Sequence, residues 1–169
     1  MRLLFIIILC LFSGVVFAGD TNRVPLELTP IGKPEMAAVL RDAHYSVFGY
    51  FPSKRRLAVA WAQVAIENRQ GLEVYNHNLG NITSGKDRPY YVKRNRFRAH
   101  KTFSDGAIDY WNVVKKMCSR SFKYFNKGQP YQAAQVLKQC GYYGANADRY
   151  GKAMVWLYNY ACAQVLPQL

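Results

Sequence analysis

A single glutamate, Glu67, ends an almost wholly apolar run, Leu57 to Ile66, in which Gln63 is the only polar side chain. A run that is apolar around most of a helical wheel predicts a buried central helix. Glutamate is rarely placed in such surroundings without a partner or a chemical role. At the C-terminus of a helix, the macrodipole and the loss of water both oppose ionisation. We therefore expect Glu67 to hold its proton to unusually high pH, as a general acid must. The alternative is a surface residue just after a core helix.

The elements that must position Glu67 are predicted mainly as helices. A first helix is expected from Pro34 to Gly49, because proline favours a first helical turn and apolar residues recur on one face. Ser53 can cap the central helix that ends at Glu67. Three further helices are expected at 104–122, 130–140 and 147–166.

The helical period disappears between Asn68 and Lys101, where glycines and Pro89 punctuate a segment of polar, tyrosine and basic residues. A small β-hairpin is expected around Tyr90 to Phe97. Loops of this length inside a compact domain usually line a site. The predicted fold is therefore mainly α, with about five helices around a central buried helix and a long loop or small β-hairpin inserted after it.

The N-terminus has the pattern of a secretory signal peptide over residues 1–18. Arg2 precedes an apolar stretch, Leu3 to Phe12, and small residues end at Ala18. We expect cleavage near Ala18 and export to the periplasm or the extracellular space, with no stable membrane span left. Residues 19–33 are expected to form an irregular leader, and residues 34–169 a single domain.

The chain after Ala18 is strongly basic. The full chain has 23 Lys+Arg and 10 Asp+Glu; without Arg2, 22 against 10 remain, so the mature net charge is near +12. Such an excess predicts anionic partners rather than a fold. For an exported protein these are a bacterial envelope with its anionic polymers, nucleic acid or a lipid surface.

Cysteines and histidines offer structure rather than a metal site. An oxidising compartment favours one disulfide among Cys118, Cys140 and Cys162, and the sequence does not choose the pair. Cys118 and Cys162 both fall on the apolar side of a predicted helix, so buried thiols are equally compatible with the pattern. The three histidines are scattered, and no spacing resembles metal ligands. We expect no metal and no cofactor.

Four blocks of the sequence resemble, in order and spacing, the lysozyme-like β-N-acetylglucosaminidases of the flagellar and autolysin type, also described as mannosyl-glycoprotein endo-β-N-acetylglucosaminidase-like domains. The blocks are Ala62–Glu67; Asn78–Ile82; Arg96–Ala99 with Asp105–Tyr110; and Gly141-Tyr142 with Tyr150. Together they cover roughly residues 54–158. The resemblance implies an α-rich lysozyme-like fold that cleaves β-1,4 bonds between the amino sugars of peptidoglycan glycan strands.

The same resemblance implies roles for individual residues. Glu67 would protonate the glycosidic oxygen as the general acid, Asn78 and Gly80 would shape the cleft floor, and Tyr142 would contact sugar. The structural alternatives are a turn-capping amide for Asn78 and packing at a helix end for Tyr142. The other tyrosines of the last third, Tyr150 among them, are expected in the core and the cleft wall.

A second carboxylate is harder to assign. Glycosidases commonly pair the acid with a carboxylate that serves as base or nucleophile. The nearby candidates are Glu73 and Asp87; farther along, Asp105 is expected in the first turn of its helix and Asp109 on an exposed helix face. One acid also suffices if polar loop residues hold the water, or if the substrate's N-acetyl group assists. Attack by the sugar's 6-hydroxyl, the lytic transglycosylase outcome, needs only one glutamate as well.

The segment 86–101 holds seven Lys or Arg, one Asp and three aromatic residues. In a cell-wall enzyme, Tyr90 and Tyr91 would stack on sugar rings while the charges concentrate an anionic polymer. A merely solvated loop is the plainer alternative. The same pattern fits a secreted nucleic-acid or polyanion binder, because basic and aromatic residues together grip single strands. A lysozyme-like fold that only binds the wall is the third reading. We favour the exported peptidoglycan glycosidase.

Overall fold

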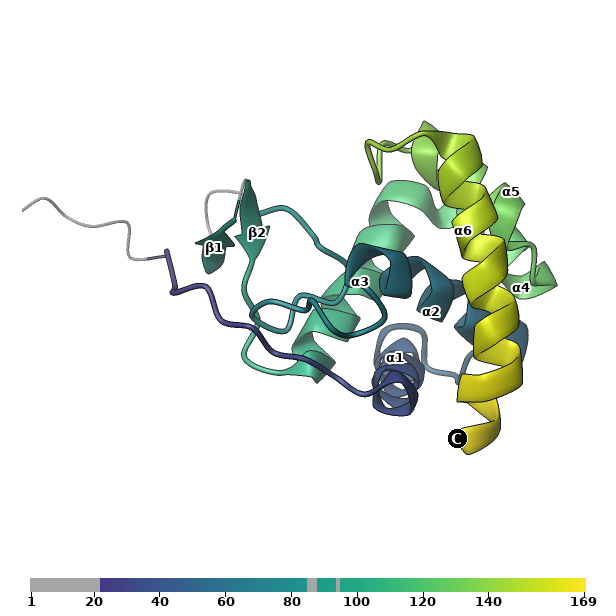
Figure 1. Cartoon of the computed structure of the whole chain (residues 1–169), viewed down its shortest axis with the longest axis horizontal. Helices are drawn as coiled ribbons and strands as arrows, with labels where there is room; N and C mark the ends of the chain where they lie inside the picture. The colour runs from purple at the N-terminus through teal and green to yellow at the C-terminus, as the bar shows by residue number, and fades with distance from the viewer. Residues whose placement is uncertain (1–21, 85–87, 94) are drawn as a thin grey trace, which may run out of the picture.

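The computed structural model describes residues 22–84, 88–93 and 95–169; the predicted signal peptide lies outside the described residues. These residues form six α-helices and one two-stranded antiparallel sheet (Figure 1). Their bounds are α1 Lys33–Phe48, α2 Lys54–Glu67, β1 Tyr90–Val92, β2 Arg96–Arg98, α3 Phe103–Cys118, α4 Phe122–Lys127, α5 Pro130–Gln139 and α6 Ala147–Tyr160. The predicted class, a mainly helical fold with a small β-hairpin, is confirmed.

The central helix is α2, which packs against α1, α4 and α6. Its N-terminus is capped by Ser53, whose hydroxyl accepts a hydrogen bond from the Arg56 amide at 3.2 Å. Every residue from Arg56 to Ala65 is buried. Gln63, the one polar side chain of the apolar run, accepts a 2.7 Å hydrogen bond from the Tyr110 hydroxyl, so its carbonyl oxygen is satisfied in the core. Glu67 stands where this buried helix meets the surface.

The expected helix from Ser104 to Phe122 is divided. It ends at Cys118, and the chain bends through a short 3₁₀ turn, Ser119–Ser121, into the additional helix α4. The Ser121 hydroxyl donates a 2.7 Å hydrogen bond to the Cys118 carbonyl oxygen, which closes the bend. The bend lets α4 pack against both α2 and α5.

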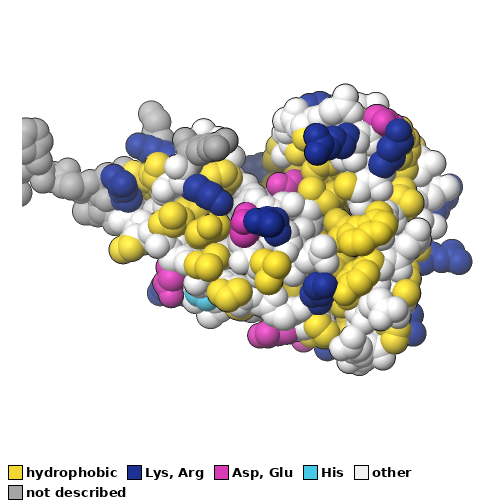
Figure 2. Space-filling model, in the orientation of Figure 1, with side chains coloured by type: hydrophobic (Ala, Val, Ile, Leu, Met, Phe, Trp, Pro, Cys, Tyr) yellow, Lys and Arg dark blue, Asp and Glu magenta, His cyan; other side chains and the backbone are white. Residues whose placement is uncertain are grey.

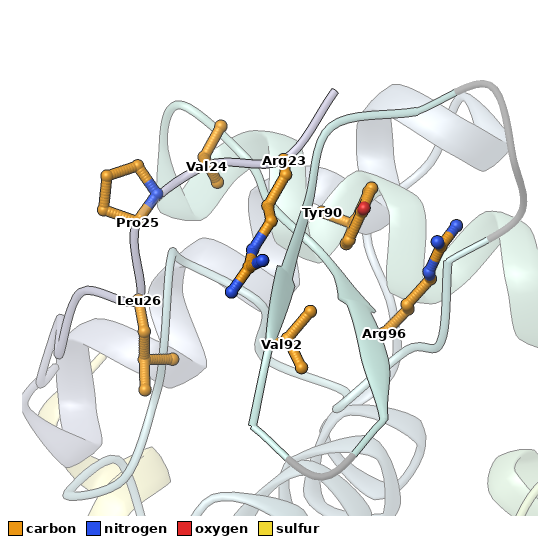
Figure 3. A pocket seen from close by; sticks show the side chains of 7 residues that line it. All are labelled: Arg23, Val24, Pro25, Leu26, Tyr90, Val92 and Arg96. Carbon is orange, nitrogen blue, oxygen red and sulfur yellow. The ribbon is translucent and has the colours of Figure 1, made fainter. Parts of the chain in front are cut away.

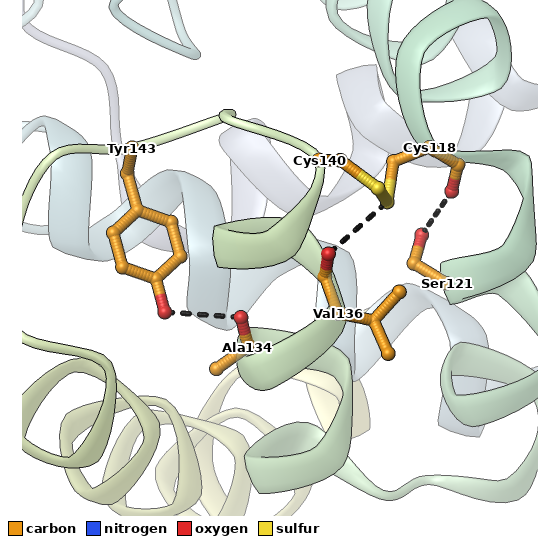
Figure 4. The surroundings of a disulfide bond; sticks show 6 residues. All are labelled: Cys118, Ser121, Ala134, Val136, Cys140 and Tyr143. Carbon is orange, nitrogen blue, oxygen red and sulfur yellow. Dashed lines mark hydrogen bonds between the residues drawn. A yellow bond between two sulfur atoms is a disulfide. The ribbon is translucent and has the colours of Figure 1, made fainter.

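One disulfide joins Cys118, at the end of α3, to Cys140, which follows α5 (Figure 4). The bridge decides the pairing that the sequence left open. Cys162 is free and exposed, so its predicted place on the apolar side of the last helix is wrong. The reason is that α6 passes into a π-helical turn, Ala161–Val165, which rotates the residues after Tyr160 relative to a continuous α-helix.

The segment between α2 and α3 is built from turns rather than helix. Arg69, Gln70, Asn76, His77 and Asn81 adopt positive φ angles. Beside it, the leader runs extended towards α1 (Figure 1). Three backbone amides of the leader donate hydrogen bonds to backbone carbonyl oxygens of this segment. Val24 donates to Tyr90 at 2.8 Å, Thr29 donates to Val74 at 2.8 Å, and Ile31 donates to Gly71 at 3.0 Å. The leader thus anchors the hairpin side of the molecule to the helical side.

Over the described ranges, no helix is both long and apolar enough to cross a membrane.

Candidate active site

Glu67 opens onto a pocket of about 200 Å³ between the end of α2 and the hairpin. The lining residues are Glu67, Glu73, Asn81, Tyr91, Lys93, Asn95 and Phe97. They come from the central helix, the turn that follows it and the inner side of the hairpin. A hollow is visible between the hairpin side and the tip of the α5–α6 region (Figure 2). Glu67, Asn81 and Phe97, which come from three of the four blocks of the resemblance, therefore line one pocket.

Burial raises the pKa of the Glu67 carboxyl above its ordinary value, as the sequence predicts. Two neutral donors oppose the shift without reversing it. The Tyr150 hydroxyl donates a 2.7 Å hydrogen bond to Glu67 Oε1, and the Asn81 side chain also favours the charged form. A half-buried carboxyl keeps its proton to higher pH than a carboxyl in water. The neutral donors fix the orientation of this carboxyl.

Asn81 lies where two hollows meet. Its side-chain amide donates to the backbone carbonyl oxygen of Glu67, and its φ of 47° places it in the left-handed region that asparagine tolerates. Besides the Glu67 pocket, it lines a second pocket of about 100 Å³. The residues of that pocket are Gly80, Asn81, Ile82, Thr83, Val113, Met117, Gly141 and Tyr142. Asn81 therefore separates the two pockets and lines both of them.

Asn78 is wholly buried and shapes the loop that carries Asn81. Its side-chain amide donates to the carbonyl oxygens of Ile82 at 2.9 Å and Arg98 at 3.0 Å, and its side-chain oxygen accepts from the Ile82 amide at 2.9 Å. Both the nitrogen and the oxygen of the Asn78 side-chain amide thus form hydrogen bonds with backbone groups. The structural alternative considered for Asn78, a turn-organising amide, describes these contacts.

Gly80 lies close to Tyr142 in the second pocket. The Tyr142 hydroxyl is 3.4 Å from the Gly80 carbonyl oxygen, and a Cβ at Gly80 would come within 2.9 Å of the same hydroxyl. Any residue larger than glycine at position 80 would therefore displace the Tyr142 hydroxyl. Tyr142 lines the pocket but does not contact Glu67 directly through any hydrogen bond in the described structure.

Tyr150 is the residue of this site that sequence reasoning placed only in the core or cleft wall. Tyr150 lies far from Glu67 in sequence, on the first turn of α6. Its ring stacks on the ring of Tyr143, with the centroids 3.7 Å apart and the planes inclined by 10°. The stacking directs the Tyr150 hydroxyl to Glu67. Its position in the fourth block of the resemblance was the available signal.

The two hairpin tyrosines face opposite sides, because side chains alternate along a strand. Tyr91 faces the Glu67 pocket, but it is only 1% exposed and stacks on Phe97 at 5.6 Å. Burial raises the pKa of Tyr91 to about 12. Tyr90 instead lines an outer groove between Arg23 and Arg96 (Figure 3). Of the two tyrosines proposed to contact sugar, only Tyr91 lines the Glu67 pocket. Because Tyr91 is buried, it forms part of the pocket wall and does not present an exposed ring face.

Asp109 was expected on an exposed helix face, and that expectation is wrong: it is 8% exposed. Arg98 Nη1 lies 2.6 and 2.7 Å from its two oxygens, and Arg88 Nη1 lies 3.3 Å from Oδ1. His100 Nε2 is 3.5 Å from Oδ2. The sequence could not show this, because these partners come from the loop that folds over α3. Part of the basic segment is therefore used to hold the hairpin on α3.

Among carboxylates beyond Glu67, Glu73 lines the same pocket and pairs with Arg69 at 2.5 Å. Asp105 lies in the first turn of α3 as predicted, where the Thr102 hydroxyl donates to its carboxylate at 2.8 Å. Asp87 lies outside the described residues. No group of three or more metal-ligating side chains occurs in the part of the chain that the structure describes.

Comparison with known proteins gives a fold but no sequence family. No family model and no curated protein matches the chain. Among solved structures, it is similar to one described as the crystal structure of a peptidoglycan hydrolase mutant from Sphingomonas sp. A1, with a TM-score of 0.57 and 19% identity. The match covers 80% of this chain and 99% of that one. The chain thus has the overall fold seen in a peptidoglycan hydrolase.

Proposed function

We propose that the protein is an exported glycosidase that cleaves β-1,4 bonds between the amino sugars of peptidoglycan, with Glu67 as the general acid. The observation that carries the proposal is a carboxyl whose pKa is raised by burial, held by Tyr150 and open to a pocket. The fold shared with a peptidoglycan hydrolase supports the choice of substrate. The basic charge of the mature chain suits an anionic wall.

In the proposed mechanism, protonated Glu67 donates its proton to the glycosidic oxygen while the bond from that oxygen to the anomeric carbon breaks. The leaving sugar departs as an alcohol and the remaining sugar acquires oxocarbenium character. The hydrogen bond from Tyr150 keeps the carboxyl in one orientation before transfer. After transfer, Tyr150 and Asn81 stabilise the carboxylate, because both contribute interactions that favour the charged form.

Glu73 is the second carboxylate that the described pocket offers. It would take the proton of an attacking water, or balance the positive charge of the oxocarbenium ion, while Arg69 holds it in place. Assistance by the substrate's N-acetyl group would make Glu73 dispensable. Attack by the 6-hydroxyl would give an anhydro end instead of a reducing end. These routes differ in product and in their dependence on Glu73.

A binder without catalysis is the alternative function, and the excess of basic residues is the observation in its favour. It would hold cell wall or nucleic acid on the same fold. Two features weigh against a nucleic-acid groove on the hairpin. Tyr90 and Tyr91 are 3% and 1% exposed, so neither presents a free ring for base stacking. Arg98 is engaged with Asp109.

The test is release of muropeptides from purified peptidoglycan by the mature protein, Glu67→Gln and Glu73→Gln at low salt, with the new ends identified by mass spectrometry. Cleavage by the wild type and loss in Glu67→Gln is the expected result. Reducing ends would identify hydrolysis and anhydro ends transglycosylation. If no form cleaves and all bind the wall equally, the protein is a binder. If Glu67→Gln cleaves at the wild-type rate, the acid has been assigned to the wrong residue.

A further inference from the structure

Lys93 reaches the Glu67 pocket from the end of the first hairpin strand. Strand alternation puts it on the same side as Tyr91, and both line the pocket that Glu67 opens onto. The Lys93 ammonium lies 4.3 Å from the centre of the Tyr75 ring, a cation–π contact that restrains the side chain. The Lys93 amide donates to the Asn95 carbonyl oxygen at 3.3 Å, which fixes the backbone of the turn.

The charge of this ammonium is not compensated within the described lining of the pocket. Glu73 is engaged by Arg69, and Glu67 accepts a hydrogen bond from the neutral Tyr150 hydroxyl. In the described ranges of the chain, no carboxylate lies within ion-pair distance of Lys93. The pocket therefore combines the Glu67 carboxyl with an exposed ammonium that is restrained by Tyr75. A carboxylate on the substrate would give this ammonium the charged partner that the described lining of the pocket does not provide.

We infer that Lys93 determines specificity by binding a carboxylate carried by the glycan, and so separates muramic-acid-containing strands from neutral chains of N-acetylglucosamine. This inference rests on the proposed glycosidase function. Muramic acid carries a lactyl ether whose carboxylate is free on strands without stem peptides; on intact strands the carboxylates belong to the peptides. Both sources present the same chemistry to an ammonium, a charge-assisted hydrogen bond to a carboxylate oxygen.

Lys93 acts on the substrate and not on the acid. Burial, Tyr150 and Asn81 are the causes of the shift in the Glu67 pKa, and Lys93 is not among them. Removing the ammonium should leave the pH dependence of cleavage in place. A change in KM that depends on the charge of the substrate is the signature of direct recognition, because uniform binding energy appears in KM.

The experiment compares the wild type with Lys93→Met and Lys93→Arg on three substrates: intact peptidoglycan strands, strands stripped of stem peptides, and soluble chitin oligosaccharides. Lys116→Met, an exposed position on α3 outside both pockets, removes the same charge as a control. Binding of each substrate is also measured in the Glu67→Gln background by calorimetry. That measurement reports on Lys93 even if the chain does not cleave.

Lys93→Met should raise KM about tenfold on the acidic strands, with little change in kcat, no change on chitin oligosaccharides and an unaltered pH profile. Lys93→Arg should retain most of the binding. A selective loss on stripped strands would identify the lactyl carboxylate, and a selective loss on intact strands the stem peptide. Equal losses on acidic and neutral substrates, or the same loss in Lys116→Met, would overturn the inference. A wild type that binds through Lys93 but cleaves nothing would sink the proposed activity alone.

Discussion

Glu67 and Asp109 are two carboxylates held near the protein surface by buried helices, and their surroundings differ in kind. Glu67 has neutral hydrogen-bond donors, the Tyr150 hydroxyl and the Asn81 amide. Asp109 has charged and titratable partners, Arg98 and Arg88 in ion pairs and His100 at 3.5 Å. Neutral donors orient a carboxyl while burial keeps its proton in place. Cationic partners bind the carboxylate form and give it a structural use.

The difference separates the structural role of Asp109 from the chemical role that we propose for Glu67. Asp109 ties the base of the hairpin to α3, because Arg98 ends β2 and His100 follows it. The hairpin so anchored forms one wall of the pocket in which Glu67 stands. One carboxylate builds the cleft, and the other is available to act in it.

The largest expected effect is that of Glu67→Gln on activity. Removing a general acid lowers the rate by about 10²- to 10⁴-fold, whereas the amide can still accept the Tyr150 hydrogen bond. The melting temperature should therefore stay the same or rise, since a group selected for function is seldom optimal for stability. Muropeptide release and thermal unfolding measure the two effects. A large fall in melting temperature would mean that Glu67 is structural, like Asp109.

Asp109→Asn should give the reverse pattern. Breaking a largely buried ion pair by removing one partner costs about 3 kcal/mol, because Arg98 is left without its counter-charge. Urea unfolding would measure the loss. The folded fraction should still cleave at a rate within several-fold of the wild type. The comparison fails if the variant is as stable as the wild type yet inactive, because Asp109 would then belong to the chemistry.

Tyr150→Phe should move the alkaline limit of activity to higher pH. Burial raises the pKa of Glu67, and the hydrogen bond from Tyr150 lowers it. Loss of this hydrogen bond therefore raises the pKa further, so Glu67 stays protonated to higher pH. The rate below this limit should fall about tenfold, because the carboxyl is less well oriented. The profile of kcat/KM against pH tests both. A shift to lower pH would contradict the proposed electrostatics of Glu67.

His100→Asn should produce the smallest effect, a change in how stability depends on pH. Burial lowers the pKa of His100 in the folded protein; Asp109 and Asp105 oppose this shift, while Arg98 and Arg88 add to it. The unfolded chain therefore binds the proton more readily, and stability falls as the pH drops below the ordinary value of 6.5. Urea unfolding of the variant between pH 7 and 5 should show a shallower decline. An identical decline would place its origin in another group, such as the buried His44.

Much of the helical framework follows from the sequence because its signals are local. The apolar run predicts a buried helix, Ser53 provides its cap, and the chemistry of glutamate marks Glu67 at its end. Glycines and asparagines predict the long irregular segment, where five non-glycine residues indeed adopt positive φ. Each of these features depends on neighbours within a few positions. A carboxyl with a raised pKa at the end of a core helix was therefore predictable.

The tertiary structure alone decided which residues meet. Tyr150 reaches Glu67 across 83 positions, and Asp109 becomes buried because a loop folds its cations over α3. The alternation of the hairpin sends Tyr91 and Lys93 to the pocket and Tyr90 to the outer groove. A bend after α3 brings Cys118 to Cys140. Composition specifies the groups available, but burial, pKa and pairing depend on distances between segments remote in sequence, which only packing determines.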